Sequence, residues 1–434
     1  MNTQRKNVRI ALTALVLAAA VYLVGGRAGW FGDSANRTTE KLDVIKFGML
    51  PYGDHTQAII GIKKGWFEDV GIRIDYEVIK IENVVPFLYK GELDMCSSPA
   101  GLLYPAYDTA PGLGIFVFAD IFQGYAIMSQ PGLQCRSFDE FLADGMDRED
   151  AFRATMQQLK GKVFAYPSET AIKPFIDIVT QKGGLKVGDF EPLVQDDSLT
   201  INSMRQKTAD FQVGGAPSRI TLTKEGYKPI ITSLNVASTA KPSHLSRELG
   251  SVFPDGWAIR KQMLDEHRDL VLRMASVCFR INDYIINQTD EALAVHMPFL
   301  TTATGEQFTA KDGRIIYESL NPFYTFKQQY SWYHNSEDPF YYKHINGAGL
   351  QSFIDQGIYR NSVPKLEDFI YADDIYFELE SLKKEAEGNF AKLEDGGSLR
   401  MKASKLLESA RKHHSIYNYY DSARLSAEAL AQPE

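Results

Sequence analysis

The stretch PYGDHTQAIIGIKKGWFEDVGI (51–72) places a polar loop directly before a short apolar run and two glycine turns. Upstream, KLDVIKFGML (41–50) alternates apolar and polar residues as a strand does, and IRIDYEVI (72–79) alternates in the same way downstream. The pattern predicts strand, loop, helix and strand, which is the start of an α/β sheet. Ligands collect in such sheets where loops leave the carboxyl ends of strands. The loop 51–56 is therefore a candidate site, through Tyr52, Asp54 and His55.

The N-terminus has the composition of a targeting segment. Arg5, Lys6 and Arg9 precede 15 residues without a charge (10–24), which is typical of a secretory signal. This run is shorter than the roughly 20 residues of a comfortable membrane span. We expect residues 1–28 to be a signal peptide, with an uncleaved membrane anchor as the alternative. Either one predicts a protein in the periplasm or at the cell exterior.

Composition excludes some partners. The chain has 434 residues, 44% of them hydrophobic, which is ordinary for a globular protein of two or three structural units. It carries 55 acidic and 47 basic residues, and an acidic surface is unsuited to nucleic acid. The cysteines Cys96, Cys135 and Cys278 allow one disulfide plus a free thiol, or three buried thiols, and their spacing is not that of a zinc knuckle.

Alternating strand and helix patterns recur in two similar modules. Two extended segments, 114–130 and 251–261, are placed to cross between the modules, which predicts a two-lobed α/β fold with two hinge strands. The expected parts are lobe 1 (44–125 and, after the return hinge, 251–375), lobe 2 (126–250), and a C-terminal helical extension (376–434) that resembles an appended helical pair broken at Gly396-Gly397.

Common enzyme signatures are absent from the sequence. It contains no G-x-x-x-x-G-K-[ST], H-E-x-x-H or G-x-S-x-G. Residues 238–241 match S-x-x-K, but Pro242 follows at once and the companion motifs are missing. The pair His413-His414 is interpreted as a solvated helix face. We therefore expect no catalytic residues, no metal site and no cofactor.

Small hydroxyl residues follow two predicted strands. Ser97 and Ser98 come after LDMC, and Ser168 and Thr170 come after VFAYP, each where a helix is expected to begin. They could simply cap those helices, for which Ser and Thr are preferred. The same free N–H groups and helix dipole also bind anionic or polar ligands. Two such turns facing each other across a cleft would hold a small ligand from both sides.

The chain resembles the extracytoplasmic solute-binding proteins of ABC importers, in the group that serves nitrate, sulfonate, taurine and thiamine-precursor uptake (periplasmic binding proteins of type II). The resemblance spans about 45–370 and is carried, in family order, by IKFGMLPYGDH…GIKKGWFEDVGIRIDYEV, LYKGELDMCSS, LKGKVFAYPSETAIKPFIDIVTQKGGL, VGGAPS and LQSFIDQGIYRNSVPKLEDFI. It implies a monomer whose two lobes close on one small solute without chemistry, and an ABC permease as partner.

The resemblance also implies site residues. The ligand loops would contain Tyr52, Asp54 and His55 in the first, Ser97 and Ser98 in the second, Ser168 and Thr170 in the third, and Gly214, Gly215 and Ala216 in the fourth, with Asp255 and Trp257 on the hinge beside the cleft. Arg219 is the one obvious anion partner near these loops. The expected ligand is thus a small polar or monoanionic organic solute, or a neutral aromatic compound.

Two other functions stay open at this level. His55 lies ten residues before Gly65, as in the thiamine pyrimidine synthases of the same superfamily, whose histidine is consumed to build the pyrimidine. The cysteine-rich iron motif of those enzymes is missing. A membrane-anchored sensor on the same fold is the other alternative. Segments 136–158 and 321–344 depart from the family pattern, and we expect the aromatic residues of 321–344 to be core.

Overall fold

The computed structural model describes residues 42–168, 171–186, 188–239, 247–395 and 401–432. The chain divides into two units, Met1–Asp43 and Val44–Glu434, and every helix within the described residues belongs to the second. None of these helices is both long and apolar enough to cross a membrane. The predicted signal segment 1–28 and the apolar run within it lie outside the described residues.

Lobe 1 is built on a five-stranded sheet in the order β2-β1-β3-β10-β4. The strands are β1 (Asp43–Met49), β2 (Ile72–Val78), β3 (Met95–Pro99), β4 (Leu113–Phe122) and β10 (Phe253–Arg260). β1 runs parallel to β3, whereas β10 lies antiparallel between β3 and β4. The sheet therefore joins two segments of sequence that are separated by the whole of lobe 2.

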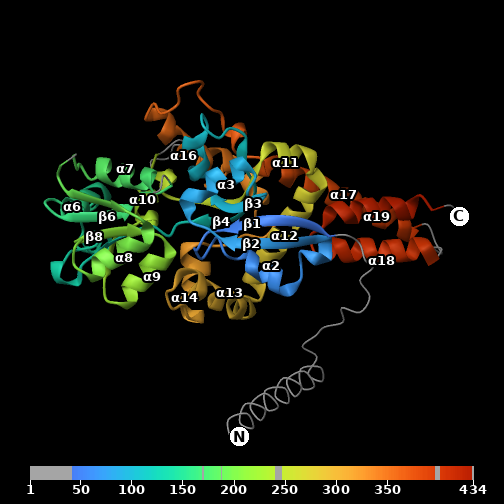
Figure 1. The fold of residues 1–434 in the computed structure, drawn as a ribbon, viewed down its shortest axis with the longest axis horizontal. Helices are drawn as coiled ribbons and strands as arrows, with labels where there is room; N and C mark the ends of the chain where they lie inside the picture. The colour runs from blue at the N-terminus through green and yellow to red at the C-terminus, as the bar shows by residue number, and fades with distance from the viewer. Residues whose placement is uncertain (1–41, 169–170, 187, 240–246, 396–400, 433–434) are drawn as a thin grey trace, which may run out of the picture. The chain divides into compact units, whose positions relative to one another are not determined.

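Lobe 2 repeats this plan in the order β7-β6-β8-β5-β9. Its strands are β5 (Ala126–Ser129), β6 (Val163–Pro167), β7 (Glu191–Gln195), β8 (Phe211–Gly214) and β9 (Lys228–Thr232). β6 is parallel to β7 and β8, and β5 is the antiparallel insert between β8 and β9. The chain crosses once between β4 and β5 and returns into β10 (Figure 1). The two-lobed α/β architecture with two hinge strands is confirmed.

Helices cover both sheets. Those of lobe 1 are α2 (Ala58–Lys64), α3 (Val84–Lys90), α4 (Ala100–Leu103), α11 (Lys261–Glu266), α12 (Arg268–Asn287), α13 (Thr289–Thr304), α14 (Ala310–Ile315), α15 (Tyr330–His334) and α16 (Tyr342–Asp355). Those of lobe 2 are α5 (Phe138–Ala143), α6 (Arg148–Gln157), α7 (Lys173–Lys182), α8 (Asp197–Arg205), α9 (Ala216–Lys224) and α10 (Ser233–Ala237). The segment 136–158, which departs from the family pattern, consists mainly of the helices α5 and α6.

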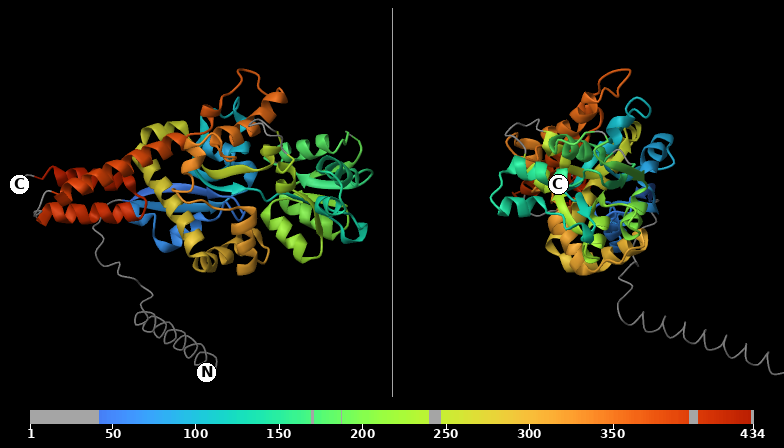
Figure 2. Two further views of the ribbon diagram at one scale, coloured as in Figure 1. Left: turned by 180° about the vertical axis from the view of Figure 1, so that it is seen from behind. Right: turned by 90° about the vertical axis from the view of Figure 1, so that its left-hand side faces the viewer.

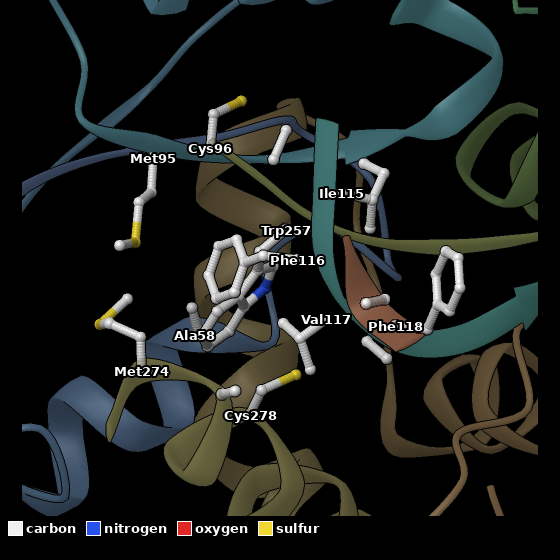
Figure 3. Packing of buried hydrophobic residues seen from close by; sticks show 14 of the residues in the cluster. Ala58, Met95, Cys96, Ile115, Phe116, Val117, Phe118, Trp257, Met274 and Cys278 are labelled. Carbon is white, nitrogen blue, oxygen red and sulfur yellow. The ribbon is translucent and has the colours of Figure 1, made fainter. Parts of the chain in front are cut away.

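The core of lobe 1 is organised around Trp257 of β10. Its indole is fully buried and contacts the rings of Phe47 and Phe67, with ring centroids 5.1 and 6.2 Å away. Figure 3 shows Trp257 enclosed by the sheet, by Ala58 of α2 and by Cys278 of α12. Trp257 was expected beside the cleft, and its side chain belongs to the core instead.

Two predicted helix starts are wrong. Ser97 and Ser98 lie inside β3, opposite Trp257 and Gly256 of β10, and the helix begins at Ala100. Pairing with β10 keeps the two serines extended, so neither caps a helix. In lobe 2 the helix begins at Lys173, with no side-chain cap, rather than at Ser168. Thr170 lies outside the described residues.

The C-terminal extension has three helices rather than a pair: α17 (Ala372–Asp395), α18 (Met401–Ser415) and α19 (Tyr419–Leu430). Figure 2 shows them side by side, extending from lobe 1 away from lobe 2. The base of α17 is docked on lobe 1, because the Tyr376 hydroxyl donates to the carbonyl of Phe326 at 2.9 Å. The predicted break at Gly396-Gly397 lies outside the described residues.

The aromatic segment 321–344 supplies core residues, as predicted. Its buried side chains are Phe323, Phe326, Trp332, Tyr333 and Tyr342. All three cysteines are free thiols, two of them buried and Cys135 partly exposed. The disulfide alternative is therefore wrong.

Candidate ligand-binding site

A cleft between the two lobes consists of a small inner cavity and a larger outer chamber. The inner cavity has a volume of about 30 Å³, enough for an ion or one or two water molecules. The outer chamber has a volume of about 720 Å³, which is in the range of small-molecule sites. The two spaces are continuous, because both are lined by Tyr52, Ile81, Pro167 and Asp197.

The loop after β1 reaches the cleft through a tight turn. The backbone N–H of Tyr52 donates to the carbonyl of Leu50 at 2.8 Å, and that of His55 donates to the carbonyl of Tyr52 at 3.2 Å. Ser97 supports the base of this turn, since its hydroxyl accepts a hydrogen bond from the N–H of Leu50 at 3.1 Å. The turn brings Tyr52, Asp54 and His55 onto the inner wall, as the sequence predicts.

A buried group of titratable side chains lies at the inner end. Nε2 of His55 is 3.8 Å from Oδ2 of Asp54 and 3.5 Å from Oδ2 of Asp255. Burial lowers the pKa of the His55 imidazole, and the negative charge of Asp54 raises it in part. Asn321 donates its amide N–H to Oδ2 of Asp54 at 2.8 Å. The sequence predicts no metal site, yet these three side chains are of types that ligate metals and lie close enough to share an ion.

A further carboxyl group lies behind this group. Asp120 of β4 is directly opposite Asp255 of β10 in the strand register, and both are buried. Burial and the negative charge of Asp54 raise the pKa of Asp120 well above its ordinary value, and the nearby amide of Asn321 offsets part of this shift. Within the described residues, no lysine or arginine lines the inner cavity. The inner end of the cleft is therefore strongly acidic.

Aromatic residues of the hinge region line the inner cavity. The rings of Phe122 and Phe253 are stacked at 4.9 Å, and Tyr125 meets Phe122 edge-on at 4.5 Å. These three residues flank the two crossings between the lobes and were missed by the sequence analysis. Phe122 and Phe253 belong to hydrophobic strands, and the sequence pattern of such a strand is the same whether an aromatic residue faces a cleft or the core.

Lobe 2 contributes a missed acidic residue, Asp197, in the first turn of α8. Its carboxylate accepts a hydrogen bond from Tyr52 across the cleft, and burial raises its pKa to about 6. Lys80 of lobe 1 lies 3.3 Å from the carboxylate of the neighbouring Asp196. The outer chamber is thus bounded by polar contacts that join the lobes.

The fourth predicted loop lies on the inner wall. Gly214, Gly215 and Ala216 all line the inner cavity, at the end of β8 and the start of α9. A Cβ at Gly214 would lie 2.1 Å from the hydroxyl oxygen of Ser218 and 2.5 Å from Nε2 of Gln212, so any larger residue here would displace these two side chains. This loop, the first loop and Asp255 are the predicted site residues that the structure brings together.

The remaining predicted residues lie elsewhere. Ser97 and Ser98 are fully buried in β3 and do not line either space. Ser168 lines the outer chamber. Arg219 is turned toward the hinge, where its guanidinium donates to the carbonyl of Gly124 at 3.4 Å. The anion partner predicted from the sequence is therefore not on the cavity wall.

A comparison with known protein families identifies the family of this chain. The family described as NMT1/THI5 like matches residues 53–292, which is more than half of the chain and includes most of the cleft. The chain belongs to the NMT1/THI5-like family. No curated protein sequence is similar enough to count as a relative.

Solved structures share the fold. The periplasmic aliphatic sulphonate-binding protein SsuA of Escherichia coli superposes with a TM-score of 0.53 at 11% identity, over 77% of this chain and 99% of that one. A ligand-binding component of an ABC-type import system from Staphylococcus aureus, with zinc bound, has a TM-score of 0.51 at 14% identity, over 77% of this chain and 98% of that one. The alkanesulfonate-binding protein SsuA of Xanthomonas axonopodis pv. citri, bound to MOPS, has a TM-score of 0.52 at 11% identity, over 75% of this chain and 96% of that one. The predicted periplasmic-binding-protein fold is confirmed.

Proposed function

We propose that this protein is an extracytoplasmic solute-binding protein that captures a small organic solute and delivers it to an ABC permease without turnover. The family match and the two-lobed fold support this proposal. The single observation that carries it is a chamber of about 720 Å³ whose wall comes from both lobes. A solute that touches both lobes stabilises the closed state, which is how such proteins select a ligand.

The acidity of the cleft favours a cationic or neutral solute over an anion. Among the described residues, the outer chamber is lined by four acidic side chains against one lysine, namely Glu82, Asp196, Asp197 and Glu306 against Lys80. Tyr52 adds an aromatic ring at the junction with the inner cavity. Carboxylates combined with an aromatic ring bind ammonium groups through charge and cation–π attraction. We therefore propose an organic amine or an amino-substituted heterocycle in place of the monoanion expected from the sequence.

Thermal denaturation with a solute panel tests this proposal. A ligand at a hundredfold excess over Kd adds about 2.7 kcal/mol of stability, which in a chain of this length corresponds to a shift of several degrees. We expect quaternary ammonium compounds, primary amines or aminopyrimidines to give this shift, and nitrate, taurine and alkyl sulfonates to give none. Stabilisation by the anions alone would refute the proposed solute class.

A pair of variants locates the binding site. Tyr52→Ala combined with Asp197→Asn removes the aromatic ring of lobe 1 and a negative charge of lobe 2 at the cleft, and should abolish the shift. Tyr330→Ala combined with Asp265→Asn makes the same chemical changes at exposed positions and should preserve it. Equal shifts in both double variants would place the solute elsewhere.

One observation favours a second candidate function, that of an enzyme similar to the thiamine pyrimidine synthases. His55 lines the inner cavity, so the residue that those enzymes consume occupies the cleft here. Intact-mass spectrometry before and after aerobic incubation with Fe²⁺ and the stabilising solute distinguishes the two functions. A binding protein keeps its mass, whereas a single-turnover synthase loses mass at His55.

A further inference from the structure

Asp54, His55 and Asp255 place three side chains of metal-ligating type within reach of one ion. One donor atom from each side chain lies within 4.8 Å of the others. The distances of 3.5 and 3.8 Å from His55 Nε2 to the two carboxylates exceed the 2.7–3.2 Å of ordinary N–H···O hydrogen bonds. Bonds of about 2.0–2.2 Å to a tetrahedral zinc ion would separate the ligand atoms by about 3.3–3.5 Å. Small side-chain movements therefore suffice to close the group on an ion.

The imidazole of His55 is an independent sign of a missing partner. Its side chain is only 4% exposed, and its Nδ1 atom has no hydrogen-bond partner among the described residues. Buried polar atoms are normally satisfied, and no hydrogen bond at Nδ1 stops this ring from turning to offer either nitrogen to an ion.

Charge and space point in the same direction. The buried carboxyl groups of Asp54 and Asp255 lie 3.8 and 3.5 Å from Nε2 of His55, and Asp120 lies opposite Asp255 on the adjacent strand. Burying several carboxyl groups close together is costly, and a bound cation offsets that cost. In the part of the chain that the structure describes, the inner cavity has no lysine or arginine on its wall, and its volume of about 30 Å³ matches an ion or one or two water molecules. A small cation fits both constraints.

We propose that Asp54, His55 and Asp255 form a binding site for a divalent transition-metal ion, of which Zn²⁺ is the best match. One imidazole nitrogen and two carboxylate oxygens suit Zn²⁺ better than Ca²⁺, which takes six to eight oxygen ligands. Asn321 orients the Asp54 carboxylate through the 2.8 Å hydrogen bond, as residues that hydrogen-bond to metal ligands do. The ion would link the first ligand loop to the hinge strand β10.

Zinc titration of the chelator-treated protein, without solute, tests the site. Isothermal titration calorimetry should detect one tight zinc ion per chain. Asn321→Ala, which removes a hydrogen bond to the ligand Asp54, should weaken zinc binding roughly 10–100-fold. His55→Gln and Asp255→Asn, which remove ligands, should weaken it by more than this. His267→Gln combined with Asp265→Asn removes an exposed histidine and aspartate of lobe 1 and should leave binding unchanged. Because no solute is present, the result is independent of the proposed function.

X-ray absorption of the zinc-loaded wild-type protein covers the case in which a variant fails to fold. We expect one imidazole and otherwise oxygen ligands, with no sulfur. Absence of a tight zinc ion, or unchanged affinity in folded His55→Gln and Asp255→Asn, overturns the site. Loss of zinc binding on replacing His413 and His414 would reveal adventitious binding on the C-terminal helices and would also overturn it.

Discussion

Nε2 of His296 in α13 lies 2.6 Å from the hydroxyl oxygen of Thr56 in the ligand loop. The Thr56 hydroxyl donates to the carbonyl of Tyr52 at 2.9 Å, so Thr56 must accept from the N–H of His296. Nδ1 of His296 then accepts from the hydroxyl of Tyr317 at 2.7 Å. Burial lowers the pKa of His296 to about 3, and the imidazole therefore stays neutral at physiological pH. A helix distant in sequence thus fixes the turn that presents Tyr52 and Asp54.

Thr56→Val tests this network. The substitution preserves the shape of the side chain but leaves the buried N–H of His296 without an acceptor, which costs about 1–3 kcal/mol. We expect that loss in the free energy of unfolding by urea, together with weaker solute binding. Thr56→Ser keeps the hydroxyl and should lose less than Thr56→Val. Equal destabilisation by the two substitutions would mean that the methyl packing, and not the hydrogen bonds, matters.

Asp197 should give the protein a specific pH dependence. Its pKa is about 6 in the folded protein against 3.8 as the ordinary value, so the folded state binds the proton more tightly than the unfolded state. The contribution of Asp197 to stability is therefore favourable below about pH 4 and is lost as the pH rises to about 6. Asp197→Asn should become more stable relative to wild type across this interval. Parallel melting-temperature curves from pH 4 to 7 would contradict the assignment.

Ion pairs between the lobes should make closure depend on salt. Arg205 of lobe 2 lies 3.2 Å from Glu306 of lobe 1, and Lys224 lies 3.0 Å from Asp312. Exposed pairs contribute up to about 1 kcal/mol each and are screened by salt. Glu306→Gln should therefore increase the radius of gyration at low salt, measured by small-angle X-ray scattering. Glu318→Gln removes an ion pair with Arg314 within lobe 1 and should leave the radius unchanged.

Two glycines should respond in opposite ways to alanine. A Cβ at Gly61 in α2 would lie 2.8 Å from the Phe67 ring and 2.9 Å from Ile281, so Gly61→Ala should cost about 1–3 kcal/mol through overpacking. A Cβ at Gly388 in α17 meets nothing within 4 Å, and Gly388→Ala should add up to about 1 kcal/mol through helix propensity. Denaturant unfolding measures both changes. Stabilisation by Gly61→Ala would contradict the close packing of α2 on α12.

Local pattern was sufficient to predict the strands, the two lobes and the first ligand loop, because these depend on residues close together in the sequence. The prediction that a helix begins at Ser97 or Ser98 was wrong because β10, more than 150 residues later, pairs with these serines and keeps them in a strand. Phe122 and Phe253 were missed for a related reason: an aromatic residue in a hydrophobic strand has the same pattern whether it faces a core or a cleft. The closeness of Asp255 to His55 and Asp120 likewise depends on strand order, which a single sequence does not state.

The position of β10 constrains how the chain can assemble. This strand fills the gap between β3 and β4, but it is synthesised only after every strand of lobe 2. Domains generally fold as units while synthesis proceeds. When residue 250 has emerged, lobe 2 already has all five of its strands, whereas β3 and β4 still lack their shared neighbour. The lobe that begins the sequence is therefore the last to complete its sheet, and a chain that stops before Phe253 leaves those two edges open for pairing with other molecules.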